Sequence, residues 1–177
     1  MTTKTKILFA ITLVAIGVAG RLLPHAWNFA PVVAIGIFSG AYLGKRFAFA
    51  VPVIAMVASD IFIGFYGWQM NAAVYIAMGL AGLTGLTLQK KKNPVTIALA
   101  SVAGSTVFFL VTNGAVWLFT SMYEPTISGL SASYIAGMPF FRNAIVGDVW
   151  YSFSLFGAYE AAKVLYHRFA PAKTLVS

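Results

Sequence analysis

The sequence contains no cysteine, which excludes disulfide bonds, cysteine-ligated metal sites and thiol catalysis. Charged residues are also scarce, at 9% of 177 residues, where a soluble domain typically carries about 25%. With only four acidic residues, the chain cannot give a water-facing surface to a globule of this size. Two histidines are too few for a multi-histidine metal site, so we expect no metal and no cofactor.

Motifs for catalysis and nucleotide binding are missing as well. The sequence has no P-loop, no His-Glu-x-x-His and no Gly-x-Ser-x-Gly. We therefore expect a protein that does not hydrolyse ATP itself and is not an enzyme. The net charge of +8 is compatible with nucleic-acid binding, but the basic residues form short clusters between apolar runs. This distribution is typical of membrane proteins, so we expect no nucleic-acid partner.

Long apolar runs are abundant. Hydrophobic residues make up 60% of the chain and the mean hydropathy is +0.85. The runs do not alternate as strands would, so they indicate helices in a lipid bilayer. We predict one all-α integral membrane domain over residues 1–177. Its six transmembrane helices are expected at residues 7–23, 31–44, 47–65, 71–88, 94–119 and 140–165, the second being short enough to be tilted or partly re-entrant.

The distribution of lysine and arginine predicts the orientation of these helices. With the N-terminus inside the cell, ten basic residues lie on the cytoplasmic side and only Arg21 and Arg142 lie outside. We therefore expect a multi-pass protein of the inner (plasma) membrane with both termini in the cytoplasm. A secretory signal peptide is an alternative for the first run, since Lys4 and Lys6 precede it and Ala19-Gly20 supplies small residues.

Polar residues within the spans predict a binding site. Ionisable side chains in a membrane are costly, so they usually face the bundle interior, a cavity or a partner. We expect Asp60 or Asp148 to pair with Arg21 or Arg142 near the outer end of the bundle. Small-molecule contacts are expected from polar and aromatic residues mapped to that end: Arg21, His25, Trp27, Asn28, Asp60, Trp68, Asn113 and Asp148. The structural alternative is that these residues only tie the helices together.

The segment 123–141 is the longest polar stretch between runs, and we expect it to be a lid with hinges at Gly129 and Gly137. Near the cytoplasmic end, the spacing of Glu160 and Lys163 predicts a local ion pair. Small residues recur at helix-packing intervals. Intramolecular packing is expected from Gly79, Gly82, Gly85, Ala100 and Gly104, and docking of a partner from Ala15 and Ala19.

Four stretches carry a resemblance to a known family: residues 21–31, 40–42, 51–52 and 59–64. They resemble a family of small, functionally uncharacterised bacterial membrane proteins, which in turn resembles the substrate-binding S components of energy-coupling factor transporters. That resemblance implies six helices, a vitamin or metal pocket near the outer face, and docking onto a transmembrane coupling protein with two ATPase subunits. Ala15 and Ala19 match the docking motif, whereas the N-terminus lacks the histidine arm of the nickel and cobalt members.

The function predicted from these observations is uptake of a small organic, vitamin-like molecule by a substrate-binding subunit without its own ATPase. One alternative is a non-transport membrane subunit or assembly factor that packs against a partner through Gly/Ala helix faces. A third is a small intramembrane enzyme. A co-purifying organic molecule would favour the first, and a tight membrane partner without a ligand would favour the second.

Overall fold

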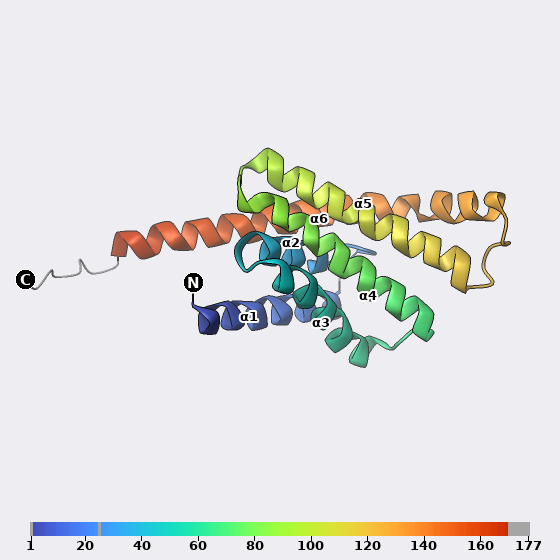
Figure 1. Ribbon diagram of the computed structural model, residues 1–177, viewed down its shortest axis with the longest axis horizontal. Helices are drawn as coiled ribbons and strands as arrows, with labels where there is room; N and C mark the ends of the chain where they lie inside the picture. The colour runs from blue at the N-terminus through green and yellow to red at the C-terminus, as the bar shows by residue number, and fades with distance from the viewer. Residues whose placement is uncertain (1, 25, 170–177) are drawn as a thin grey trace, which may run out of the picture.

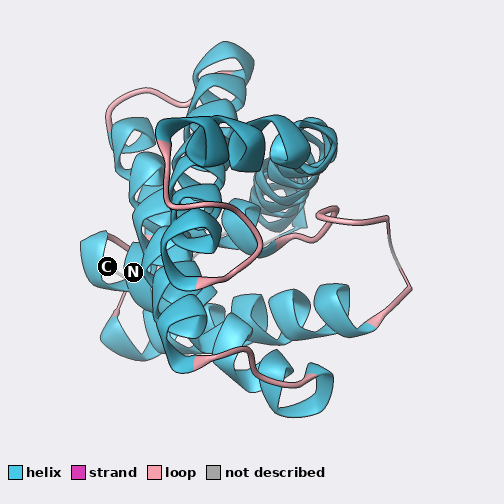
Figure 2. Cartoon of the chain, turned by 90° about the vertical axis from the view of Figure 1, so that its right-hand side faces the viewer, coloured by secondary structure: helices cyan, strands magenta, loops and turns pink. Residues whose placement is uncertain are grey.

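A computed structural model describes residues 2–24 and 26–169, and within these ranges the ordered elements are all helical (Figures 1 and 2). In chain order they are α1 (Thr3–Leu22), α2 (Val32–Tyr42), α3 (Lys45–Ile63), α4 (Trp68–Leu83), the 3-10 helix η1 (Thr84–Gln89), α5 (Pro94–Phe119) and α6 (Ile127–Phe169). The predicted all-α class is therefore confirmed for this part of the chain.

The bundle has two chemically different ends. At one end, Lys6 Nζ of α1 donates to the Leu43 carbonyl at 3.4 Å, and Gln89 Nε2 donates to the Gly40 carbonyl at 2.9 Å. We call it the basic end, because the loops there adjoin Lys45, Arg46 and residues 90–92. The opposite end carries the loops 64–67 and 120–126 (right in Figure 1), and we call it the aromatic end.

Helix α2 is the centre of the bundle. Ten of its 11 residues are buried, and it contacts each of the other five α-helices. A helix covered on all sides can be apolar all round, which explains its uniform composition. Its length of roughly 16 Å is about half the thickness of a hydrocarbon core. The expected span 31–44 is therefore a short core helix that cannot cross a bilayer alone.

Four helices among the described residues are long and apolar enough to cross a membrane. They are α1, α3, α4 together with η1, and α5. Helix α6 has 43 residues, but it is not one of the four because polar side chains such as Asn143 and Asp148 recur along it. Several apolar helices of this length and composition indicate a membrane protein. The described residues contain six α-helices but only these four candidate spans, so the predicted count of six transmembrane helices stays a prediction.

Segment 123–141 is not the loop lid that we expected. From Ile127 onward it is the first part of α6, which runs alongside α5 in Figure 1. Two side chains fasten it there, since Ser133 Oγ donates to the Asn113 carbonyl and Tyr134 Oη to the Leu110 carbonyl. Gly129 and Gly137 are buried helical positions rather than hinges. Small residues in this stretch permit close packing against α5.

The predicted role of the small residues in internal packing is confirmed. A Cβ on Gly82 would collide with the Ala48 carbonyl oxygen, and one on Gly85 would collide with that of Ile37. A Cβ on Gly104 would lie 2.9 Å from Val33 Cγ1, a less severe contact. The predicted ion pair is present too, with Lys163 Nζ 2.8 Å from Glu160 Oε2 on the surface of α6.

Candidate functional site

Arg21 and Asp60 form a largely buried ion pair between α1 and α3. Nη1 of Arg21 lies 2.6 Å from Asp60 Oδ1 and also donates to Ser59 Oγ and to the Met56 carbonyl. The Tyr75 hydroxyl of α4 donates to Asp60 Oδ2 at 2.8 Å. Only 16% of the Arg21 side chain and 3% of the Asp60 side chain are exposed. The prediction that Asp60 faces inward and pairs with an arginine is confirmed.

Asp148 of α6 is buried without an arginine partner. Its residue is 4% exposed, and Ser105 Oγ of α5 donates to Oδ2 at 2.6 Å. One turn toward the basic end, Ser101 and Ser152 share a hydrogen bond of 2.8 Å across the same interface. The ion pairs in the described part of the chain are Arg21–Asp60 and Glu160–Lys163, so Arg142 does not pair with either aspartate.

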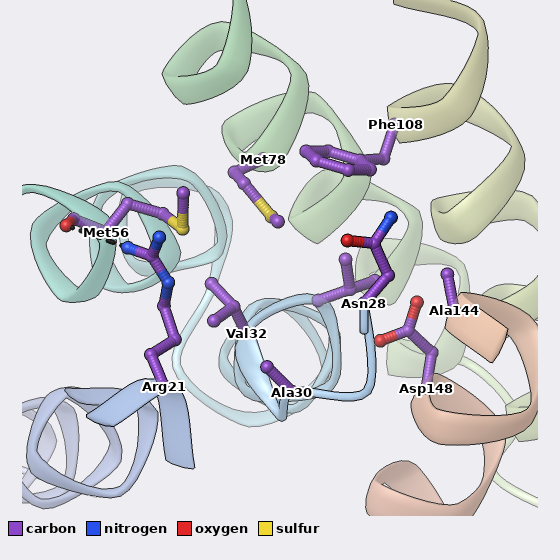
Figure 3. A pocket seen from close by; sticks show the side chains of 10 residues that line it. Arg21, Asn28, Ala30, Val32, Met56, Met78, Phe108, Ala144 and Asp148 are labelled. Atoms are coloured by element: carbon purple, nitrogen blue, oxygen red, sulfur yellow. Dashed lines mark hydrogen bonds between the residues drawn. The ribbon is translucent and has the colours of Figure 1, made fainter. Parts of the chain in front are cut away.

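These two acidic centres flank a cavity of about 170 Å³. Figure 3 shows Arg21 on one side and Asp148 on the other, with Asn28 reaching in beside Asp148. Asn28 lies in the connection between α1 and α2 and has a left-handed backbone, with φ of 56°. The remaining wall is mostly apolar and comprises Ala30, Val32, Val33, Met56, Met78, Phe108 and Ala144. A few polar groups on an apolar wall are typical of small-molecule sites.

The cavity lies deeper than the outer-end position that we expected. Phe108 follows Pro94 by 14 residues and precedes Phe119 by 11, which places the cavity roughly 21 Å and 16 Å from the two ends of α5. The reason is that α1 ends one residue after Arg21 and α3 three residues after Asp60. Helices α4, α5 and α6 continue further toward the aromatic end (Figure 1).

Two further cavities lie between this level and the aromatic end. The second, of about 180 Å³, shares Asn28, Phe108 and Ala144 with the first, and is also lined by Trp27 and Asn113. The third, of about 410 Å³, shares Asn28 and Asn113 with the second and reaches the loop residues Tyr66, Met122 and Tyr123. Asn28 lines all three cavities, so all three adjoin this residue.

The expected site residues fall into different places. Arg21, Asn28 and Asp148 line the deepest cavity, and Trp27 and Asn113 line the second. Asp60 lies behind Arg21 and does not line the cavity. Trp68 is 75% exposed and lines a separate apolar groove of about 640 Å³ between α4, α5 and α6. His25 lies outside the described residues.

Sequence reasoning missed most of the cavity wall. No sequence pattern distinguishes Met56, Met78 and Phe108 from other residues of an apolar helix. Their place in the cavity wall is known only from how the helices pack in the structure. Ser105 had a signal, because Ser101 and Ser105 are four residues apart and therefore share one face of an otherwise apolar helix. Across residues 2–24 and 26–169, no group of three His, Asp or Glu side chains is arranged to hold a metal ion.

The expected docking residues Ala15 and Ala19 are exposed on α1, next to Ile11 and Ile16. The face that α1 turns inward carries Leu13 and Gly17 instead, and a Cβ on Gly17 would meet Ile35 and Ala55. The two alanines are thus left outside the internal packing of the bundle.

A family model described as a family of unknown function, DUF6580, matches residues 1–172. Neither a curated protein nor a solved structure gives a significant match. The predicted relation to a family without assigned function is confirmed, and the further relation to S components stays a prediction.

Proposed function

We propose that this chain, which belongs to the DUF6580 family of unknown function, is a membrane-embedded substrate-binding subunit for uptake of a small organic molecule. The supporting observation is a series of three neighbouring cavities, each lined in part by Asn28, between the aromatic end and the polar groups of Arg21 and Asp148. In this proposal the six helices form a bundle of the S-component type. The molecule enters from outside and is held at mid-depth among Met56, Met78 and Phe108.

The orientation follows from the basic residues. Lys45, Arg46 and residues 90–92 adjoin the basic end, which is therefore cytoplasmic in this proposal. The aromatic end then faces the exterior, with Tyr66, Met122 and Tyr123 around the outermost cavity. Such an arrangement suits capture of a molecule from outside the cell.

The energy for release comes from a partner in this proposal, since the sequence has no motif for ATP hydrolysis. Ala15 and Ala19 are exposed small residues on α1, where a second helix can approach closely. A transmembrane coupling protein with two ATPase subunits is the partner that we propose for this face.

The same α1 face favours a second candidate, a non-transport membrane subunit or assembly factor. In that case the partner on Ala15 and Ala19 would bind tightly and the cavities would stay without a ligand. Purification in mild detergent separates the two candidates, because a stable partner without any small molecule supports only the second.

We expect a small organic molecule to co-purify from native membranes and to be lost in Ala144→Leu. Ala144 lines both the first and the second cavity, so a larger side chain there narrows their junction. Ala158→Leu is the matched control on an exposed part of the same helix. Mass spectrometry of the purified proteins gives the readout. Equal retention by both variants, or no bound molecule in the unaltered protein, would contradict the proposal.

The orientation has its own test, made simple by the absence of native cysteine. We expect a membrane-impermeant maleimide to label Met122→Cys in intact cells, because this exposed residue lies in the loop 120–126. Lys91→Cys, in the loop before α5, should react only after the membrane is permeabilised. The reverse pattern would overturn the orientation.

A further inference from the structure

When Asp148 is ionised, no basic side chain in the described residues balances its charge within the deepest cavity. The guanidinium of Arg21 is already paired, since its Nη1 lies 2.6 Å from Asp60 Oδ1. Asp60 stands outside the lining, whereas Asp148 is part of it. No basic side chain in the described residues forms an ion pair with Asp148. With Asp148 ionised, the site therefore carries one net negative charge.

Asp148 also has unused hydrogen-bonding capacity on the cavity side. Each carboxylate oxygen can accept about two hydrogen bonds, yet the only side-chain donor to Asp148 among the described residues is Ser105, which bonds to Oδ2 at 2.6 Å. In the described part of the chain, no fully buried polar side-chain atom lacks a partner, so Oδ1 is accessible from the cavity. Figure 3 shows the carboxylate directed into this space. A buried carboxylate in a membrane helix needs a compensating partner.

The size and wall of the cavity limit what that partner is. Its volume of about 170 Å³ is close to that of an engineered apolar cavity of about 150 Å³ that binds benzene. Met56, Met78 and Phe108 supply a polarizable, aromatic wall. An aromatic face attracts a cation in addition to contacting an apolar body.

We propose that the bound molecule is a compact organic cation, with a protonated amine or amidine on a body of about one ring, and that its cationic group binds Asp148 Oδ1. This inference rests on the proposed function and specifies its substrate class. The ring lies between Met56, Met78 and Phe108, and the Asn28 amide offers a further hydrogen bond. A neutral molecule leaves the charge of Asp148 unbalanced. A zwitterion pairs with Asp148 but adds a carboxylate, and that carboxylate, like an anion, meets an arginine already neutralised by Asp60.

Three ring-sized probes test this inference on the intact protein in detergent: benzylammonium, neutral benzyl alcohol and zwitterionic phenylglycine. Binding is measured from the shift of the thermal unfolding midpoint with probe concentration. We expect benzylammonium to bind at least roughly tenfold more tightly than the other two, as a charge-assisted hydrogen bond predicts. Equal or tighter binding of benzyl alcohol or phenylglycine overturns the inference, and so does failure of all three to bind.

Two variants test whether Asp148 is the residue that binds the cationic group. Asp148→Asn should abolish the preference for benzylammonium, whereas Glu160→Gln, which alters an exposed carboxylate elsewhere on α6, should keep it. A retained preference in Asp148→Asn overturns the assignment. If Asp148→Asn fails to fold, the probe series on the unaltered protein decides alone. A co-purified molecule that is neutral or anionic would refute this inference and leave the proposed function intact, whereas absence of any bound molecule would refute the proposed function.

Discussion

Replacing Arg21 by alanine should cost about 3–5 kcal/mol of unfolding free energy, because it removes one partner of a buried ion pair. Asp60 is 3% exposed at its side chain and would keep only the hydrogen bond from Tyr75. The arginine also bonds Ser59 and the Met56 carbonyl, so its loss frees two further acceptors on α3. Unfolding by denaturing detergent, followed by circular dichroism, measures the change.

A double variant and an exposed pair serve as controls. Arg21→Met combined with Asp60→Leu should recover much of the loss, since replacing both members of a buried pair by apolar residues leaves no unpaired charge. Lys163→Ala breaks a pair whose side chains are 47% and 49% exposed, and it should change stability little. If the double variant lost as much as the sum of its single changes, the two residues would not be coupled.

The Arg21–Asp60 pair was predictable because apolar runs contain so few charges. With four acidic residues in the whole chain and three in the spans, the number of combinations was small. The partner of Asp148 was not predictable in the same way. Serines are frequent in membrane helices, and only the packing of α5 against α6 selects Ser105 from among them.

The depth of the cavity could not be predicted from the sequence. Counting basic residues assigns each loop to a side of the membrane, but it does not say how far each helix extends. Arg21 stands at the end of α1 and Asp60 near the end of α3, so the sequence predicts both near the outer end of the bundle. Because α4, α5 and α6 continue past them, the same residues lie at the level of the middle of α5.

The prediction of a loop lid over residues 123–141 was wrong for a different reason. Its Gly and Ser residues lower the local hydropathy, and a low value between apolar runs favours a loop. In the structure, those small residues bring α6 close to α5. Ser133 and Tyr134 of α6 then donate hydrogen bonds to backbone carbonyls of α5. Polar composition here reflects helix–helix packing, and a hydropathy pattern alone cannot distinguish that from a loop.

The second large effect is expected at the crossing of α2, α3 and α4. Gly82→Ala should destabilise the protein by about 1–3 kcal/mol or more, because the added methyl group has no space and the backbone must move. Its Cβ would collide with the Ala48 carbonyl oxygen of α3 and lie 3.2 Å from the Gly36 Cα of α2. Since backbone atoms form both contacts, no rotamer change can relieve them. Displacement of α2 also shifts Val32 and Val33, which line the deepest cavity.

The matched control is Gly157→Ala, a glycine in α6 with no atom within 4 Å of its added Cβ. Alanine is a better helix former than glycine by up to about 1 kcal/mol, so this variant should be as stable as the unaltered protein or slightly more stable. The two changes add the same methyl group to a helix and differ only in the space around it. Detergent unfolding midpoints measure both. Equal midpoints for the two variants would show that α2, α3 and α4 do not cross as closely as Gly82 requires.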